Sequence, residues 1–199
     1  MAKIAELLFD FVSPNAYLVW QPLKDIAVRT GATLKVTPVF LGGMHKLTGN
    51  APPFIRDGEV KGKNAYAMLE MNRFINAHGM DRFTMNPNFP FNSILLQRLL
   101  VAAQDSGQEI AFIDCLLPHI WEQGANVADA AVVAALLADS IFDADALLAK
   151  TQDPAIKQRL VDNTADSVQR GAFGIPTFFI GEDMFFGKER LGQIEAALA

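Results

Sequence analysis

The first forty residues place a short apolar run, one amphipathic helix and a second strand-like run in direct succession. Residues 7–12 (Leu-Leu-Phe-Asp-Phe-Val) have the length and bulk of a buried strand, and they end at Ser13-Pro14. Ser13 is a predicted helix N-cap, because the proline after it needs no amide hydrogen, and one apolar face then continues to Gly31. With a second strand predicted over residues 33–39, this unit has a right-handed crossover and parallel strands.

The remainder of the chain predicts irregular structure, then helices, then a hairpin. Residues 40–62 are rich in glycine, proline and polar side chains, so no regular element is predicted there. Helical periodicity follows at 63–78, 92–105, 109–123, 129–138, 143–150 and 153–170, and Pro118 is expected to kink or break the third of these helices. Two apolar runs at 177–180 and 184–186 predict a hairpin, and residues 188–198 predict a closing helix.

This order of elements predicts an α/β fold of the thioredoxin-like type, a βαβ…ββα domain with an inserted all-helical domain. Residues 1–40 form the N-terminal βαβ part, residues 41–170 the loop and the inserted helical domain, and residues 171–199 the C-terminal ββα part. Such a fold class does not determine a function, which has to be argued from a site.

Composition restricts the classes of partner. The 199 residues carry 17 Lys and Arg against 22 Asp and Glu, a net charge of −5 without any basic stretch, which argues against nucleic acid and anionic membranes as partners. Glu6 and Asp10 interrupt the first apolar run, so we expect neither a signal peptide nor a spanning helix. The single cysteine excludes a disulfide framework and, with three separated histidines, a Cys-rich zinc site; a reducing cytoplasm is the expected location.

Ser13 is the first candidate for chemistry. An N-capping hydroxyl lies beside unpaired amide groups at the positive end of a helix, where an anion is stabilised. A thiol bound there would have a lowered pKa, because the thiolate gains from the helix end and the hydroxyl while the thiol does not. The alternative, in which Ser13-Pro14 only caps the helix, stays open.

A second candidate is the pair Ile175-Pro176, which follows Gly174 and immediately precedes a predicted strand. A cis peptide at this position would let the Ile175 backbone turn outward and hydrogen bond to an extended ligand. Because only about 5–6% of X-Pro bonds are cis, the tripeptide alone does not establish the isomer.

Charged and amide side chains supply further candidates. Lys188 and Glu189, with Arg190, open the last helix and combine charges of both signs, which suits a zwitterionic amino-acid end; the alternative is a solvated first turn. Asn50 and Lys63 flank the irregular segment, where an amide and a cation could bind a carboxylate; the alternative is two surface residues without such a function.

Cys115 and the phenylalanines are interpreted as structural. Cys115 has apolar neighbours and no nearby cation in the sequence, which favours an inert thiol over a nucleophile. Four phenylalanines could line an apolar pocket, although core packing is the usual place for this residue type: Phe40, Phe83, Phe89 and Phe91.

Together these motifs resemble those of the 2-hydroxychromene-2-carboxylate isomerase and kappa-class glutathione transferase family, a DsbA-like branch of the thioredoxin fold. The most specific segments are residues 9–18 (Phe-Asp-Phe-Val-Ser-Pro-Asn-Ala-Tyr-Leu) and 171–178 (Gly-Ala-Phe-Gly-Ile-Pro-Thr-Phe), and the resemblance extends over nearly the whole chain. Between them, family features recur in order: Pro38 to Gly42, Gly49-Asn50, Lys63 with Tyr66, and Trp121 with Gly124.

The resemblance implies that Ser13 occupies the position of the attacking cysteine in the disulfide-exchanging relatives. No Cys-x-x-Cys pair exists in the sequence, so disulfide exchange by the usual route is excluded. The family uses this serine to hold the sulfur of glutathione as a thiolate, so the nucleophile belongs to the cofactor. Ser13 is therefore the expected catalytic residue, with glutathione as the expected cofactor.

By the same resemblance, Ile175 would hydrogen bond to the cysteinyl backbone of glutathione beside a cis Pro176, while Asn50 and Lys63 would contact its glycine end. The residues that open the last helix would contact its γ-glutamyl end. At this end the sequence departs from the family pattern: Gln-Asp-Arg or Ser-Asp-Arg is usual after the glycine, but this chain has Lys188-Glu189-Arg190. The glutamate carboxylate lies one methylene farther from the backbone than the usual aspartate.

The function implied is a glutathione-dependent isomerase that converts 2-hydroxychromene-2-carboxylate to trans-o-hydroxybenzylidenepyruvate in aromatic catabolism, by reversible thiolate addition. Its partners would be a small aromatic carboxylate, glutathione and a second copy of the chain in a homodimer. Two alternatives remain open: a kappa-like glutathione transferase that conjugates electrophiles, and a DsbA-like protein that binds glutathione without turnover.

Overall fold

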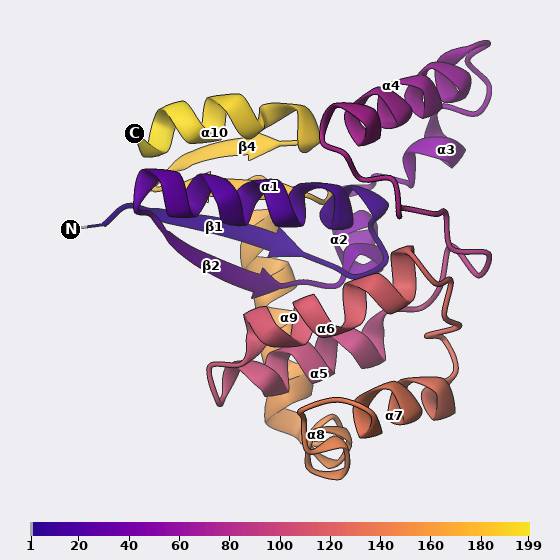
Figure 1. The fold of residues 1–199 in the computed structure, drawn as a ribbon, viewed down its shortest axis with the longest axis vertical. Helices are drawn as coiled ribbons and strands as arrows, with labels where there is room; N and C mark the ends of the chain where they lie inside the picture. The colour runs from indigo at the N-terminus through magenta and orange to yellow at the C-terminus, as the bar shows by residue number, and fades with distance from the viewer. Residues whose placement is uncertain (1) are drawn as a thin grey trace.

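A mixed four-stranded sheet runs through the middle of the protein in a computed structural model that describes residues 2–199 (Figure 1). The strand order is β2-β1-β3-β4. The central strand β1 is parallel to β2 and antiparallel to β3, and β3 is antiparallel to β4. The strands have these bounds: β1 Ile4–Phe9, β2 Thr33–Pro38, β3 Thr177–Ile180 and β4 Asp183–Phe186.

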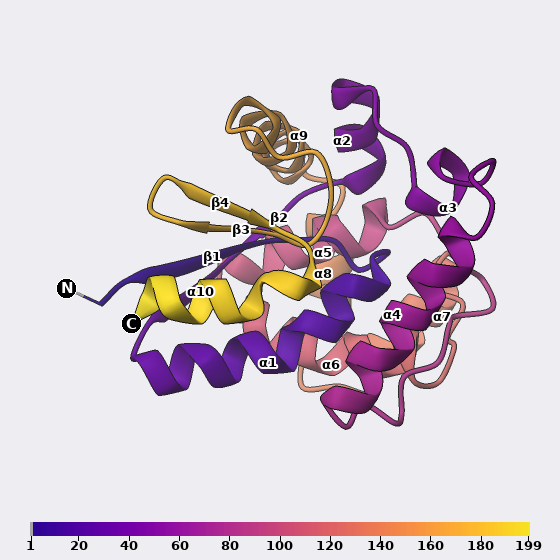
Figure 2. The same ribbon diagram turned by 90° about the horizontal axis from the view of Figure 1, so that it is seen from above.

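Helices cover both faces of this sheet. Figure 2 shows α1 (Pro14–Thr30) and α10 (Leu191–Leu198) on one face and α9 (Pro154–Gln169) on the other. A helical region lies beyond the β2 edge and consists of α5 Ile94–Gln104, α6 Glu109–Trp121, α7 Ala130–Ala138 and α8 Ala144–Lys150. The predicted thioredoxin-like fold with inserted helices is confirmed, while the domain boundaries stay a prediction. No helix within residues 2–199 is long and apolar enough to cross a bilayer.

The prediction of an irregular segment over residues 40–62 is wrong. The structure has α2 (Leu41–Thr48) and α3 (Pro53–Arg56) there, followed by α4 (Lys63–Ala77). The ring of Phe40 folds over the first turn of α2, where an added Cβ at Gly42 would lie 2.9 Å from it. The two glycines of α2, which weaken a helix by themselves, are the residues that admit this ring, so tertiary packing outweighs local propensity.

The first strand also differs from its prediction. It begins at Ile4 and ends at Phe9, and residues 10–12 form a turn. The turn forms because the Asp10 carboxylate accepts a hydrogen bond from the Val12 amide at 3.1 Å and one from the Leu41 amide at 2.8 Å. At the other predicted irregularity, Pro118 does not break its helix, since α6 continues to Trp121.

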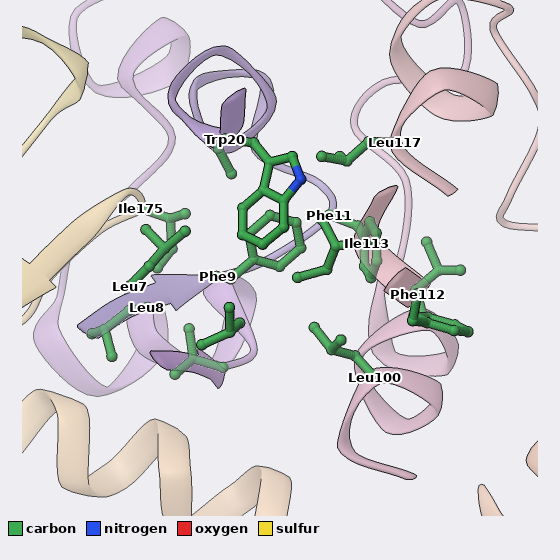
Figure 3. Close-up of a cluster of buried hydrophobic side chains, with 14 of the residues drawn as sticks. Leu7, Leu8, Phe9, Phe11, Trp20, Leu100, Phe112, Ile113, Leu117 and Ile175 are labelled. Atoms are coloured by element: carbon green, nitrogen blue, oxygen red, sulfur yellow. The ribbon is translucent and has the colours of Figure 1, made fainter. Parts of the chain in front are cut away.

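Aromatic side chains anchor the segment between β1 and α1 in the core (Figure 3). Phe9 contacts Phe11 edge-on at 4.9 Å between ring centroids, and it contacts Trp20 of α1 at 5.9 Å. Phe11 in turn packs against Phe112 of α6 at 6.1 Å. Because Phe9 and Phe11 are fully buried, the turn at residues 10–12 is held against both the sheet and the helical region.

Candidate functional site

Ser13 is the N-cap of α1, as the sequence predicts. Its backbone is extended (φ −86°, ψ 115°), Pro14 occupies the first helical position, and the Oγ atom accepts a hydrogen bond from the Ala16 amide at 3.3 Å. The same hydroxyl donates to the Ile175 carbonyl at 3.3 Å. The backbone N–H of Asn15 donates to no acceptor within residues 2–199, so the helix end keeps an unpaired donor beside the hydroxyl.

Ile175 and Pro176 reach Ser13 through the sheet. Pairing of Leu8 in β1 with Thr177 in β3 brings the segment before β3 to the N-terminus of α1, across 162 positions of sequence. The Ile175-Pro176 peptide is cis, and the Ile175 amide donates to no acceptor in the part of the chain that the structure describes. An extended ligand can therefore pair with the backbone at this position.

Asn50 lies beside the same segment. It follows Gly49, whose left-handed backbone (φ 68°) ends α2. Its Nδ2 donates to the Phe173 carbonyl at 2.8 Å, two residues before Ile175, and its Oδ1 accepts from the Ala51 amide at 2.8 Å. The structure thus brings Asn50, Ser13 and Ile175 to one region, although their functional assignment stays a prediction.

Lys63 is not brought to this group by a direct contact. It is the first residue of α4, and its ammonium lies 2.9 Å from the Asp57 carboxylate, which also binds Arg56 at 2.8 Å. The hydrogen bonds from Arg56 and then Lys63 hold the pKa of Asp57 far below its usual value. Two cations share one carboxylate, so this cluster keeps a surplus positive charge.

Lys188 and Glu189 lie next to Pro176, because the Gly187 amide donates to the Pro176 carbonyl at 3.0 Å. The Lys188 side chain is only 8% exposed and is paired with Glu189. Burial by itself would raise the pKa of Glu189, but the Lys188 ammonium and neighbouring cations outweigh it, and the pKa is lowered. Gly187 is required here, since it has φ 97° and an added Cβ would lie 2.8 Å from a Glu189 oxygen.

The short element that carries this pair is a 3-10 turn, η1 (Lys188–Arg190), rather than the first turn of an α-helix. The Lys188 ammonium also lies 5.8 Å from the centre of the Phe74 ring of α4, a cation–π arrangement. No pattern in the sequence indicates that α4 reaches the start of the last helix. The charges of both signs that the sequence predicts here are present, with the cation enclosed and the carboxylate half-exposed.

Two buried polar side chains beneath the Ser13 turn were not singled out from the sequence. Asp10 is fully buried, and burial raises its pKa to about 6 against the lowering effect of its two amide donors. Gln97 of α5 is also fully buried and donates to the Phe9 carbonyl at 2.7 Å and the Val39 carbonyl at 2.8 Å. The sequence signal that could have identified both is a charged or amide residue within an otherwise apolar run, because such a residue needs hydrogen-bond partners when it is buried.

A cavity of about 640 Å³ begins one turn along α1 from Ser13, at Tyr17, and does not include Ser13 itself. The Tyr17 hydroxyl donates to Glu122 of α6 at 3.0 Å, and its ring lies 5.5 Å from Phe83. Burial, and then the neighbouring carboxylate, raises the pKa of Tyr17 to about 12. The cavity lining combines Tyr17 with charged side chains that include Asp25 and Glu122, so the cavity is a charged groove that begins close to the Ser13 turn.

The remaining candidates hold no reactive arrangement. Cys115 of α6 is half-buried, and burial raises the pKa of its thiol, which disfavours the nucleophilic thiolate. Within residues 2–199, no three His, Cys, Asp or Glu side chains are arranged to hold a metal ion. Phe83, Phe89 and Phe91 pack around Trp121 at centroid distances of 6.0 Å.

Comparison with known proteins agrees with this geometry. A family model described as a DSBA-like thioredoxin domain matches residues 5–199. The 2-hydroxychromene-2-carboxylate isomerase of Sphingobium xenophagum is 29% identical over 198 residues, covering 100% of this chain and 99% of the relative. Glutathione S-transferase kappa 1 of Rattus norvegicus is 24% identical, covering 95% and 88%. A solved 2-hydroxychromene-2-carboxylate isomerase has a TM-score of 0.82 at 26% identity, covering 98% and 94%. Matched over almost its full length, the chain belongs to the DSBA-like thioredoxin domain family.

Proposed function

We propose that this chain is a glutathione-dependent isomerase that converts 2-hydroxychromene-2-carboxylate to trans-o-hydroxybenzylidenepyruvate in aromatic catabolism. The observation that carries the proposal is a serine, not a cysteine, at the N-cap of α1, with its hydroxyl 3.3 Å from the carbonyl that precedes a cis proline. The similarity to isomerases over the whole chain supports the reaction. A cytoplasmic location, where glutathione is reduced, is part of the same proposal.

The residues present fit a bound thiol. The Ser13 hydroxyl can rotate away from the Ile175 carbonyl, and the free Asn15 amide points from the positive end of α1. Both donors favour a thiolate over a thiol, so Ser13 lowers the pKa of the bound sulfur. When bound, glutathione supplies the sulfur nucleophile whose reversible addition turns a substrate double bond into a rotatable single bond.

The other predicted site residues offer complementary groups for the rest of the tripeptide. The unpaired Ile175 amide is available to the cysteinyl backbone of glutathione, and Asn50 lies beside it for the glycine end. Lys188 and Glu189 offer a cation and a carboxylate to the zwitterionic γ-glutamyl end. Lys63, held by Asp57, supplies positive charge for the glycine carboxylate.

Replacement of Ser13 by alanine tests the proposal. A hydrogen bond to a charged group contributes about 1.5–3 kcal/mol, so Ser13→Ala should raise the pKa of bound glutathione by about one to two units and reduce turnover at neutral pH about ten- to hundredfold. Thiolate absorbance across pH and initial rates measure both. Ser167→Ala is the matched control, because that buried hydroxyl also donates to a carbonyl, on α9. Identical thiolate titrations for wild type and Ser13→Ala would refute the assignment of Ser13.

Counting turnovers separates the isomerase from a kappa-like transferase. With less glutathione than substrate, an isomerase completes many turnovers because the cofactor is returned, whereas a conjugating transferase stops when glutathione is consumed. Tight glutathione binding without either product would instead support a binding protein. Full activity in the absence of glutathione would contradict the proposed mechanism.

A further inference from the structure

Asp10 is bonded at three points to the segments around Ser13. One carboxylate oxygen accepts from the Val12 amide at 3.1 Å, and the other accepts from the Leu41 amide at 2.8 Å. Its backbone carbonyl accepts from the Ser13 amide at 3.1 Å. The side chain is completely buried, so these bonds are not exchanged with water.

Leu41 is the first residue of α2, and α2 leads directly to Asn50. The Asn50 amide donates to the His45 carbonyl at 3.1 Å, which fixes Asn50 to the last turn of that helix. The Asn50 side chain then donates to the Phe173 carbonyl at 2.8 Å. A movement at the start of α2 would therefore displace the residue proposed to contact the glycine end of glutathione.

The hydrogen bonds close a ring around the candidate site. Asp10 belongs to the Ser13 turn and accepts a hydrogen bond from the start of α2. Asn50, at the end of α2, donates to the Phe173 carbonyl. Two residues later, the Ile175 carbonyl accepts from the Ser13 hydroxyl at 3.3 Å, which closes the ring. The three segments of the site are distant in sequence, and β1 is paired directly only with the strand that follows Pro176 and with β2. The Asp10 side chain bonds directly to the first amide of α2, whereas Gln97 joins the same turn only to Val39, two residues before that helix.

We propose that Asp10 is a positioning residue that couples the Ser13 turn to α2, so that Ser13 and Asn50 bind the sulfur and the glycine end of one thiol ligand as a single unit. Its effect on glutathione rests on the function proposed above, while the coupling itself is a property of the ligand-free chain.

The carboxylate has a specific advantage at this position. It presents an acceptor to each of two backbone amides that come from different elements. An asparagine has the same shape but only one acceptor oxygen, so its NH₂ group would face one of the two N–H donors. Asp10→Asn therefore leaves either the Val12 or the Leu41 amide without an acceptor, and so weakens the Ser13 turn or its link to α2 without creating a cavity.

A double-mutant cycle with glutathione tests the coupling. We expect Asp10→Asn and Asn50→Ala each to weaken glutathione binding about tenfold. If the two effects were independent, the double variant would bind about a hundredfold more weakly than wild type; because the residues are coupled, we expect a loss of only about twentyfold. The dissociation constants come from titration calorimetry. Thr164→Val is the matched control, because Thr164 accepts from the Phe40 amide at 2.9 Å, one residue before Leu41, without contacting the Ser13 turn. Thr164→Val should combine additively with Asn50→Ala.

Hydrogen exchange on the ligand-free protein separates this inference from the proposed function. Asp10→Asn should accelerate exchange of the Ser13 and Asn50 amides together, whereas Thr164→Val should accelerate exchange at Phe40 alone. If wild type does not bind glutathione, the proposed function fails, but the exchange data still decide the coupling. Additive losses in the cycle, or unchanged exchange at Asn50 in Asp10→Asn, would overturn the inference.

Discussion

At the scale of single residues, the buried Asp10 carboxyl group should make the free energy of unfolding depend on pH. Its pKa is about 6 in the folded chain, against 3.8 ordinarily, so between these values the folded state binds more protons than the unfolded state. The contribution of Asp10 to stability is therefore complete below about pH 4 and is lost as the pH rises through about 6, by at most about 3 kcal/mol.

The comparison with Asp10→Asn isolates this contribution. The free energy of unfolding of wild type minus that of the variant should decrease as the pH rises from about 4 to about 7, measured by urea unfolding at several pH values. Several carboxylates with lowered pKa values give the opposite slope, but they are common to both proteins and cancel in the difference. They are Glu6, Asp57, Asp105, Glu189 and Glu195. A difference that is constant with pH would contradict an ionisable, buried Asp10.

At the scale of elements, α5 is hydrogen-bonded through Gln97 to the backbone where the two parallel strands end. This amide donates to the Phe9 carbonyl at the end of β1 and to the Val39 carbonyl just after β2, and it accepts from the Phe11 amide at 3.3 Å. Gln97→Leu should lower the free energy of unfolding by about 2–4 kcal/mol, because unsatisfied buried groups cost about 1–3 kcal/mol each.

Gln104 on the same helix is the control for this prediction. It is only partly buried and makes one such bond, to the Val36 carbonyl at 2.9 Å. Gln104→Leu should cost about 1 kcal/mol in urea unfolding. Equal losses for the two variants would show that α5 docks by apolar packing alone and that Gln97 has no special place at the strand ends.

The elements that the sequence predicted correctly are those whose signals are local. Ser13-Pro14 marks the start of α1, and Gly181 marks the hairpin, because caps and turns depend on neighbouring residues. The helix α2 could not be predicted, since the reason for its adjacent glycines, Gly42 and Gly43, is the Phe40 ring that packs against them. Two adjacent glycines look the same in the sequence of a loop and in that of a helix that packs closely.

The candidate site shows the same limit. Ser13 and Ile175 were identifiable as motifs, but the bond between them depends on the pairing of β1 with β3 across the whole chain. The cation–π contact between Lys188 and Phe74 is made by two elements that are distant in sequence, so no local pattern indicates it. Family resemblance supplied the positions of such residues, whereas their partners required the fold.

At the scale of the whole molecule, α4 is unusual because it has no buried residue over its 15 positions. Figure 1 shows α3 and α4 extending away from the sheet at the upper right. Their large exposed apolar side chains and the one between them define an α3–α4 surface: Phe54, Ile55, Val60, Tyr66, Met68 and Leu69. Neither α3 nor α4 buries a residue of its own, and several large apolar side chains are exposed on them, which indicates an interaction surface.

We propose that a second copy of the chain covers the α3–α4 surface, giving the homodimer that the sequence resemblance implies. Residues 53–77 have a nearly balanced set of charges, so two copies can face each other without net repulsion. The set consists of Arg56, Lys61, Lys63 and Arg73 against Asp57, Glu59 and Glu70. Lys63 begins α4, and Lys188 lies 5.8 Å from the Phe74 ring of the same helix, so such an interface would also hold α4 beside residues proposed to bind glutathione.

Leu69→Glu tests this arrangement, because it places a charge on the α3–α4 surface, where a stable interface requires apolar burial. We expect light scattering after gel filtration to give a dimer for wild type and a monomer for Leu69→Glu, with glutathione binding weakened in the same step as α4 loses its support. Ile141→Glu is the control, since Ile141 is 81% exposed and lies in the connection between α7 and α8. A monomeric wild type would contradict the proposed homodimer. Dimers that persist in Leu69→Glu but dissociate in Ile141→Glu would show that the interface does not include the α3–α4 surface.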